Sequence, residues 1–338
     1  MALPESERRF LTRLPHLFRS QEWGLVAGIL AVLAVIYVLD RDHAFYQRYT
    51  LQFLLHQVTL FGVLAVGAAV VIIAGGIDLS TGAVVALASV VSAKLLTEWL
   101  HSGGTSELPP PAGVVAVAIG LTLLMGMTIG LIHAFMINQL RLPPFIATLA
   151  TMAGLRSLAT VLCQNKTITV PFDAYRALGK EFWISLSIFA CVAVFISILM
   201  GWTVLGRHLF ALGGNETAAR LSGLRTNRLK AVAYGLAGTL SALGGIMFTG
   251  DGGQAYSRLG TTYELTAITA AVVGGCSLSG GVGSIRGTVL GLLLTQIVLK
   301  GTGIVVHGID STQIEGLVLG TVVLLAVAFN QRFRGTNG

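Results

Sequence analysis

One acidic residue stands alone inside a long apolar stretch of the chain. Asp78 lies within VVIIAGGIDLSTGAVVAL, and no other charged residue occurs between His56 and Lys94. A carboxylate inside an apolar run is expensive to ionise, so it normally has a specific task. It can cap the helix that follows, line a translocation path or gate, or pair with a distant arginine such as Arg156 or Arg286. The sequence leaves these three roles open.

Hydroxyl and aromatic side chains accompany this acid. Phe145 and Thr148 recur at helical spacing after a proline, which fits a polar path and fits plain helix packing equally well. GGIDLSTG (75–82) and GGCSLSGG (274–281) match at five of eight positions with an offset of 199, a hint of an internal repeat. Glycine pairs followed by hydroxyls predict broken helices at both places. The residues predicted to form a path or gate are Asp78, Ser80, Phe145, Thr148, Ser277 and Ser279.

Enzymatic chemistry has little support in the sequence. An aspartyl protease needs two facing carboxylates, and Asp78 is the only aspartate inside a predicted span. No H-E-x-x-H metal-ligand spacing occurs, so we expect no metal site. No G-x-x-x-x-G-K-[ST] occurs either, so the chain does not bind ATP through a P-loop. We expect a chain that is not an enzyme and binds no cofactor of its own.

The composition defines the class of protein. Of 338 residues, 54% are hydrophobic and 11% charged, with a mean hydropathy of +0.79, whereas soluble domains carry about 25% charged residues. Uncharged runs approach the ~20 residues that cross a hydrocarbon core. We predict an all-α polytopic membrane protein with one transmembrane domain (23–330) between cytoplasmic segments at 1–22 and 331–338. About ten spans are expected, some broken at glycine clusters: 23–40, 52–75, 78–98, 112–138, 144–163, 182–204, 229–250, 263–276, 284–302 and 313–330.

The charge distribution predicts the orientation. With both termini cytoplasmic, the cytoplasmic segments and Lys230 hold 13 of the 22 lysines and arginines, as the positive-inside rule requires. The net charge of +7 is then a topology signal that also suits an anionic bilayer surface, and no nucleic acid is implied. The longest external loop, 164–181, is too short to be a ligand-binding domain. Recognition outside the membrane therefore needs partner proteins.

The cytoplasmic loop at 206–228 predicts a short helix. Within GGNETAARLSG the glycine pair gives a flexible lead-in, and Asn215 is a good N-cap. Glu216 is placed to pair with Arg220, and Gly223 is placed as the stop. These signals predict about two turns, from 216 to 222. So short a helix is marginal in water, so it needs a surface on another protein or on this protein's own helix ends.

Four motifs, in order, resemble the permease subunit of ribose-type sugar ABC importers. They are GGIDLSTG, PPFIATLATMAGLR, ALGGNETAARLSGLRTN and VVGGCSLSGGVGSIRGTVLG. The likeness covers about residues 55–329, and the broad family also includes branched-chain amino acid permeases. It implies that the cytoplasmic helix is a coupling helix seated in a groove of an ATPase subunit. The residues it assigns to that contact are Gly213, Gly214, Asn215, Glu216, Arg220 and Gly223.

The resemblance also implies the assembly and its cargo. A separate ABC ATPase would hold ATP and Mg, and a periplasmic or lipid-anchored protein would bind the substrate. A second permease subunit, identical or paralogous, would complete the path across a bacterial inner membrane, which would open alternately on each face. The cargo would be a small polar solute moved inward, a monosaccharide before nucleosides or branched-chain amino acids. A stand-alone secondary transporter or channel is the alternative, although such a protein would prefer more acids at membrane depth.

Overall fold

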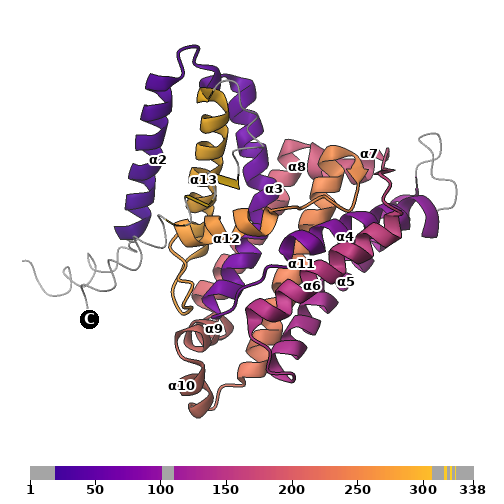
Figure 1. Cartoon of the computed structure of the whole chain (residues 1–338), viewed down its shortest axis with the longest axis vertical. Coiled ribbons are helices and arrows are strands. Elements are labelled where there is room, and N and C mark those ends of the chain that lie inside the picture. Colours follow the sequence, from indigo (N-terminus) through magenta and orange to yellow (C-terminus); the bar gives the residue numbers. More distant parts are fainter. Residues whose placement is uncertain (1–19, 101–109, 307–315, 318–319, 322–323, 325–338) are drawn as a thin grey trace, which may run out of the picture.

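The computed structural model describes residues 20–100, 110–306, 316–317, 320–321 and 324, and it is helical almost throughout (Figure 1). Within these residues, eight helices are long and apolar enough to cross a membrane. They are α2 (Ser20–Leu39), α3 (Arg48–Ile73), α4 (Thr81–Lys94) with its π-helical extension η2 (Leu95–Trp99), α5 (Ala112–Asn138), α6 (Pro144–Cys163), α8 (Phe182–Trp202), α11 (Thr226–Gly252) and α13 (Ile285–Val305). The all-α polytopic class is confirmed.

Shorter elements connect the long helices. They are η1 (Ala44–Tyr46), α7 (Asp173–Lys180), α9 (Val204–Gly214), α10 (Glu216–Leu221), α12 (Tyr263–Val273) and the two-residue strands β1 (Ile168–Thr169) and β2 (Gln254–Ala255), which pair antiparallel. The span expected at 263–276 is thus only the 11 residues of α12, about 16 Å of helix and half a bilayer core. The span expected at 313–330 lies almost wholly outside the described residues.

Two kinds of long helix differ in burial. The most apolar stretch of α3 is 89% buried and that of α11 is 72% buried, whereas α2, α6 and α8 are each 17% buried. A helix that is apolar all round and buried belongs to the interior of a bundle, and one that is apolar and exposed faces lipid. α5 approaches α11 closely, because a β-carbon on Gly126 would lie 2.4 Å from the carbonyl oxygen of Gly238. Small residues at such contacts are typical of membrane bundles.

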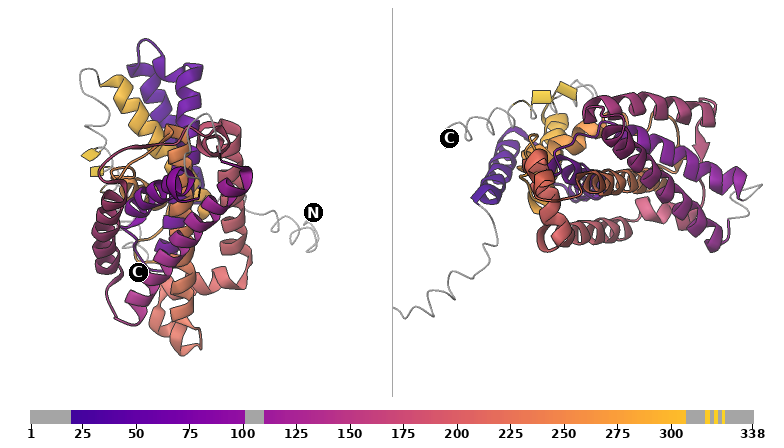
Figure 2. Two further views of the ribbon diagram at one scale, coloured as in Figure 1. Left: turned by 90° about the vertical axis from the view of Figure 1, so that its right-hand side faces the viewer. Right: turned by 90° about the horizontal axis from the view of Figure 1, so that it is seen from below.

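The connections fall at two ends of the molecule. Figures 1 and 2 place α9 and α10 at the end opposite the connection between α2 and α3. At the other end, β1 pairs with β2, and Tyr175 of α7 is fully buried with its hydroxyl 2.7 Å from Ser92 Oγ. The 164–181 loop therefore packs onto the helices and does not form a separate unit.

Candidate functional site

The short helix α10 has the local structure that its sequence predicts. The Asn215 side chain accepts a hydrogen bond from the Ala218 N–H (2.9 Å), which caps the N-terminus. Glu216 Oε1 accepts one from Arg220 Nη2 at 2.9 Å. Gly223 adopts φ +84° and ends the helix. The helix covers 216–221, one residue less than expected. The role of these residues in coupling stays a prediction.

A second cation holds α10 in place. Lys230 Nζ, in the first turns of α11, donates a 2.8 Å hydrogen bond to the same Glu216 oxygen. Partial burial alone would raise the pKa of the Glu216 carboxyl, but the hydrogen bonds and charges of Lys230 and Arg220 outweigh it and hold that pKa below its usual value. Sequence reasoning missed Lys230, because a partner 14 residues away across a turn leaves no periodic signal.

The outer face of α10 is not covered by any residue that the structure describes. Ala219 is its one buried residue, and Leu221 is 84% exposed at the tip. A leucine this exposed at the end of a helix outside the apolar bundle has no role in packing within the described chain. Of the two surfaces considered for this helix, the chain's own helix ends cover one side, and no described residue covers the other.

Immediately before α10, five glycines from three segments meet with their backbones in contact. A β-carbon on Gly213 would lie 1.9 Å from the Ile73 carbonyl oxygen and 2.6 Å from the Gly281 nitrogen. The Gly281 N–H donates a 2.9 Å hydrogen bond to the same Ile73 oxygen. We call this cluster the glycine junction, and its members are Gly75, Gly213, Gly214, Gly280 and Gly281.

The junction corrects one expectation. Gly213 and Gly214 are not a flexible lead-in to α10, because they are the last two residues of the helix α9. Their small size serves close approach at Gly213, where any side chain would meet main-chain atoms of the loops after α3 and α12. The elbow between α9 and α10 therefore lies directly against the two glycine-rich loops.

The two loops begin with the same kind of helix stop. The structurally equivalent positions, however, are separated by a different number of residues from the positions that match in the sequence motifs. α3 stops at Gly75 (φ +83°), with Gly76 N–H bonded to Val71 O, and α12 stops at Gly275 (φ +94°), with the equivalent bond from Cys276. Both are Schellman stops, which need glycine at the left-handed position. Matching those positions gives an offset of 200, whereas the letter match gave 199. The loop after α12 then runs four residues longer, because the N-caps of the following helices lie 204 apart, at residues 80 and 284.

Asp78 lies in the first loop and forms no ion pair with any described residue. Its side chain is 4% exposed, and Oδ1 accepts hydrogen bonds from the Ser80 N–H (2.8 Å) and from Ser80 Oγ (2.6 Å). The carboxylate thus braces the residue that precedes α4. Pairing with Arg156 or Arg286 is wrong, since Arg156 instead holds the loop before α12. Its guanidinium donates to Ser257 O, Leu259 O, Gly260 O and Thr261 Oγ1.

The structure brings together some of the predicted path residues. Thr148 Oγ1 accepts from the Leu79 N–H at 3.2 Å, so Asp78, Ser80 and Thr148 share one site. Phe145 is 50% exposed on the outside of α6. The other two predicted residues, Ser277 and Ser279, contact each other within the loop after α12. Ser277 Oγ accepts a hydrogen bond from the N–H of Ser279, which is exposed. The role of these residues in a path or gate stays a prediction.

Three buried polar groups from other helices lie near the Asp78 loop and were not expected there. Tyr234 Oη would be 2.4 Å from a β-carbon on Gly76, and Glu264 Oε2 would be 2.3 Å from one on Gly82. His133 lies beside Tyr234, with ring centroids 6.2 Å apart, and its Nε2 is 2.7 Å from Thr151 Oγ1. They come from α5, α11 and α12, at sequence separations that give no signal. Their hydroxyl and carboxylate fit because the loop and the start of α4 carry no side chain at those points.

Long apolar helices, a polar loop buried among them and a capped helix exposed at one end define a multi-pass membrane permease. Residues 50–327 match the family described as branched-chain amino acid transport system / permease component, and the chain belongs to this family. It is 34% identical to the ribose import permease protein RbsC of Bacillus subtilis over 92% of this chain and 93% of that protein.

Other relatives are named for the import of different solutes. The chain is 33% identical to the galactose/methyl galactoside import permease protein MglC of Escherichia coli strain K12, over 96% of each chain. It is 30% identical to the autoinducer 2 import system permease protein LsrC of Photorhabdus luminescens, over 93% of this chain and 91% of that protein. No solved structure matches the chain.

Proposed function

We propose that this chain is the membrane-spanning subunit of an ATP-driven importer that moves a monosaccharide inward across a bacterial inner membrane. The observation that carries the proposal is the short capped helix α10. Its outer face is exposed, and its N-terminal end lies against the glycine junction. The relatives named for ribose and galactose import support the cargo class. Both termini would lie on the α10 side of the membrane.

The mechanism follows from where α10 lies. An ATPase subunit that closes on ATP and Mg would push α10, which Glu216 and Lys230 tie to α11. Through Gly213 the same push reaches the end of α3, where the Asp78 loop begins, and Gly281 in the loop after α12. Helices on either side of these loops would then reorient as rigid bodies and open the opposite face. A binding protein outside would deliver the sugar, and a second permease subunit would enclose the path.

Purification of the tagged full chain from its host in mild detergent tests the proposal. We expect a P-loop ATPase in near-stoichiometric amount, identified by mass spectrometry. Leu221→Asp should remove that ATPase without loss of the permease, because the side chain is 84% exposed. Leu140→Asp is the matched control, since Leu140 is 56% exposed in another turn at the same end. A wild-type chain that purifies alone would refute the ATP-driven part and favour a stand-alone transporter.

A further inference from the structure

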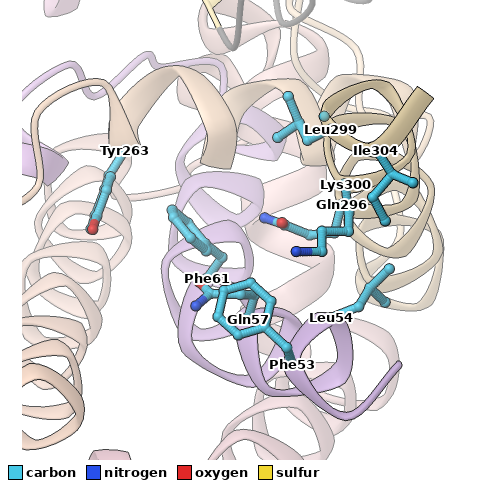
Figure 3. Close-up of a pocket in the computed structure, with 10 residues that line it drawn as sticks. Phe53, Leu54, Gln57, Phe61, Tyr263, Gln296, Leu299, Lys300 and Ile304 are labelled. Atoms are coloured by element: carbon cyan, nitrogen blue, oxygen red, sulfur yellow. The ribbon is translucent and has the colours of Figure 1, made fainter. Parts of the chain in front are cut away.

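A cavity of ≈ 410 Å³ opens between α3 and α13, far from the glycine junction. It begins near Phe53, early in α3, and reaches Ile304, late in α13, so it lies in the halves of both helices opposite α10 (Figure 3). In the proposed orientation this is the external half of the membrane. The lining residues used below are Phe53, Gln57, Phe61, Tyr263, Gln296 and Lys300.

Three polar side chains of this lining have no hydrogen-bond or ion-pair partner among the described residues. They are the carboxamides of Gln57 and Gln296 and the ammonium of Lys300, which lies 4.8 Å above the Phe53 ring. Figure 3 shows the ends of Gln296 and Lys300 together, pointing from α13 toward α3, and the end of Gln57 beside Phe61. Polar groups within the membrane need water or a polar solute, because the hydrocarbon core has no hydrogen-bond donors or acceptors. A cavity lined by these groups therefore suits water or a polar solute.

Aromatic rings form the other part of the lining. Phe61 and Tyr263 meet edge to face with ring centroids 4.7 Å apart, and Phe248 supports Tyr263 from behind at 4.6 Å. Rings held in this way offer a fixed apolar surface. The C–H face of a sugar can pack against such a surface while its hydroxyls meet groups that both donate and accept. Carboxamides are such groups.

We propose that this cavity binds a neutral polyhydroxylated solute the size of a monosaccharide on its way through the permease. The inference rests on the proposed function and names the site that would serve it. The volume lies within the ~300–1,000 Å³ of small-molecule pockets. Both carboxamides suit hydroxyl groups, and the one lining cation already has a ring beneath it. Few hydrogen bonds are available, so the solute is held weakly and can leave.

The test is uptake of labelled ribose and galactose by cells that express the chain with its ATPase and binding protein. Gln57→Leu and Gln296→Leu should each lower the maximal rate about 2- to 10-fold, the effect of one lost hydrogen bond. The concentration for half-maximal uptake should not change, because a separate protein captures the sugar. Gln52→Leu is the matched control, since Gln52 is exposed on the same helix and is not part of the lining.

The outcomes separate this inference from the proposed function. Wild-type uptake with equal rates in all three leucine variants would overturn the cavity site and leave the importer standing. No wild-type uptake of either sugar would refute the monosaccharide cargo and the site together. Co-purification of the ATPase with each variant shows that a lower rate is not a failure to fold.

Thiol labelling tests whether the cavity is open to water, without any transport. Gln296→Cys is made in a Cys191→Ser background, because Cys191 is exposed while Cys163 and Cys276 are buried. A membrane-impermeant thiol reagent should modify residue 296, and millimolar sugar should slow the reaction. A cysteine at 296 that does not react would overturn the inference whatever the uptake assays show.

Discussion

Substitution of Gly213 by alanine tests the glycine junction directly. The new β-carbon would lie 1.9 Å from Ile73 O, 2.6 Å from Gly281 N and 3.0 Å from Gly75 N. All three are main-chain atoms, so no side chain can turn aside, and the α9–α10 elbow must move by more than an ångström to reach ordinary contact near 3.4 Å. Overpacking of this kind costs about 1–3 kcal/mol, which corresponds to roughly 5- to 150-fold in an equilibrium constant.

Gly214 supplies the control one residue away. An added β-carbon there meets nothing within 4 Å, and the residue has the same helical setting at the end of α9. Alanine at 214 should be neutral or stabilising by about 0.4–1 kcal/mol, because the unfolded chain loses freedom. The thermal unfolding temperature of the purified permease should therefore fall for Gly213→Ala and hold for Gly214→Ala, and sugar uptake in cells should fall for Gly213→Ala. Equal behaviour of the two variants would refute the close backbone contact and the transmission built on it.

Two further predictions concern the tether of α10 and the buried acid. Because the folded pKa of Glu216 is depressed, its tether to Lys230 is fully present above the ordinary value of 4.5 and is lost as pH falls through the lower folded value. A spin label introduced by Ser222→Cys in the Cys191→Ser background should stay immobile from pH 8 to 5 and become mobile in stronger acid. Lys230→Gln should free the label at every pH; a label whose mobility Lys230→Gln leaves unchanged would contradict the tether. Asp78→Asn should lower sugar uptake while the ATPase still co-purifies, since the amide keeps an acceptor for Ser80 but loses the charge; unchanged uptake would leave Asp78 only its bracing role.

Local signals were enough to predict most of the fold. Uncharged runs located the eight long helices of the described chain, because hydrocarbon length and backbone hydrogen bonding leave few alternatives. The cap, the ion pair and the stop of α10 were predicted because each depends on neighbours within four residues. The same reasoning overestimated α12, where an apolar run continues past the glycine that ends the helix.

Contacts between distant segments were not predictable. Nothing near Gly213 in the sequence indicates that the end of α3 and the loop after α12 meet it, so the glycine pair predicts flexibility where the structure has close contact. Asp78 was assigned three possible roles because its partners depend on which helices surround it. The cavity between α3 and α13 could not be predicted for the same reason. Gln57 and Gln296 lie on helices far apart in sequence, and neither stands out from its local sequence.

The glycine junction is built from main-chain contacts, whereas the exposed end of α10 presents a side chain, that of Leu221. In the proposed importer, the outer residues of α10 could therefore change to suit a different ATPase subunit without altering the glycine junction behind them. A chimera that exchanges residues 217–222 between two permeases of this family should exchange their ATPase subunits as well. The glycine junction would then transmit movement in the same way whichever ATPase subunit is bound. One transmembrane architecture could serve many transported solutes and many ATPases.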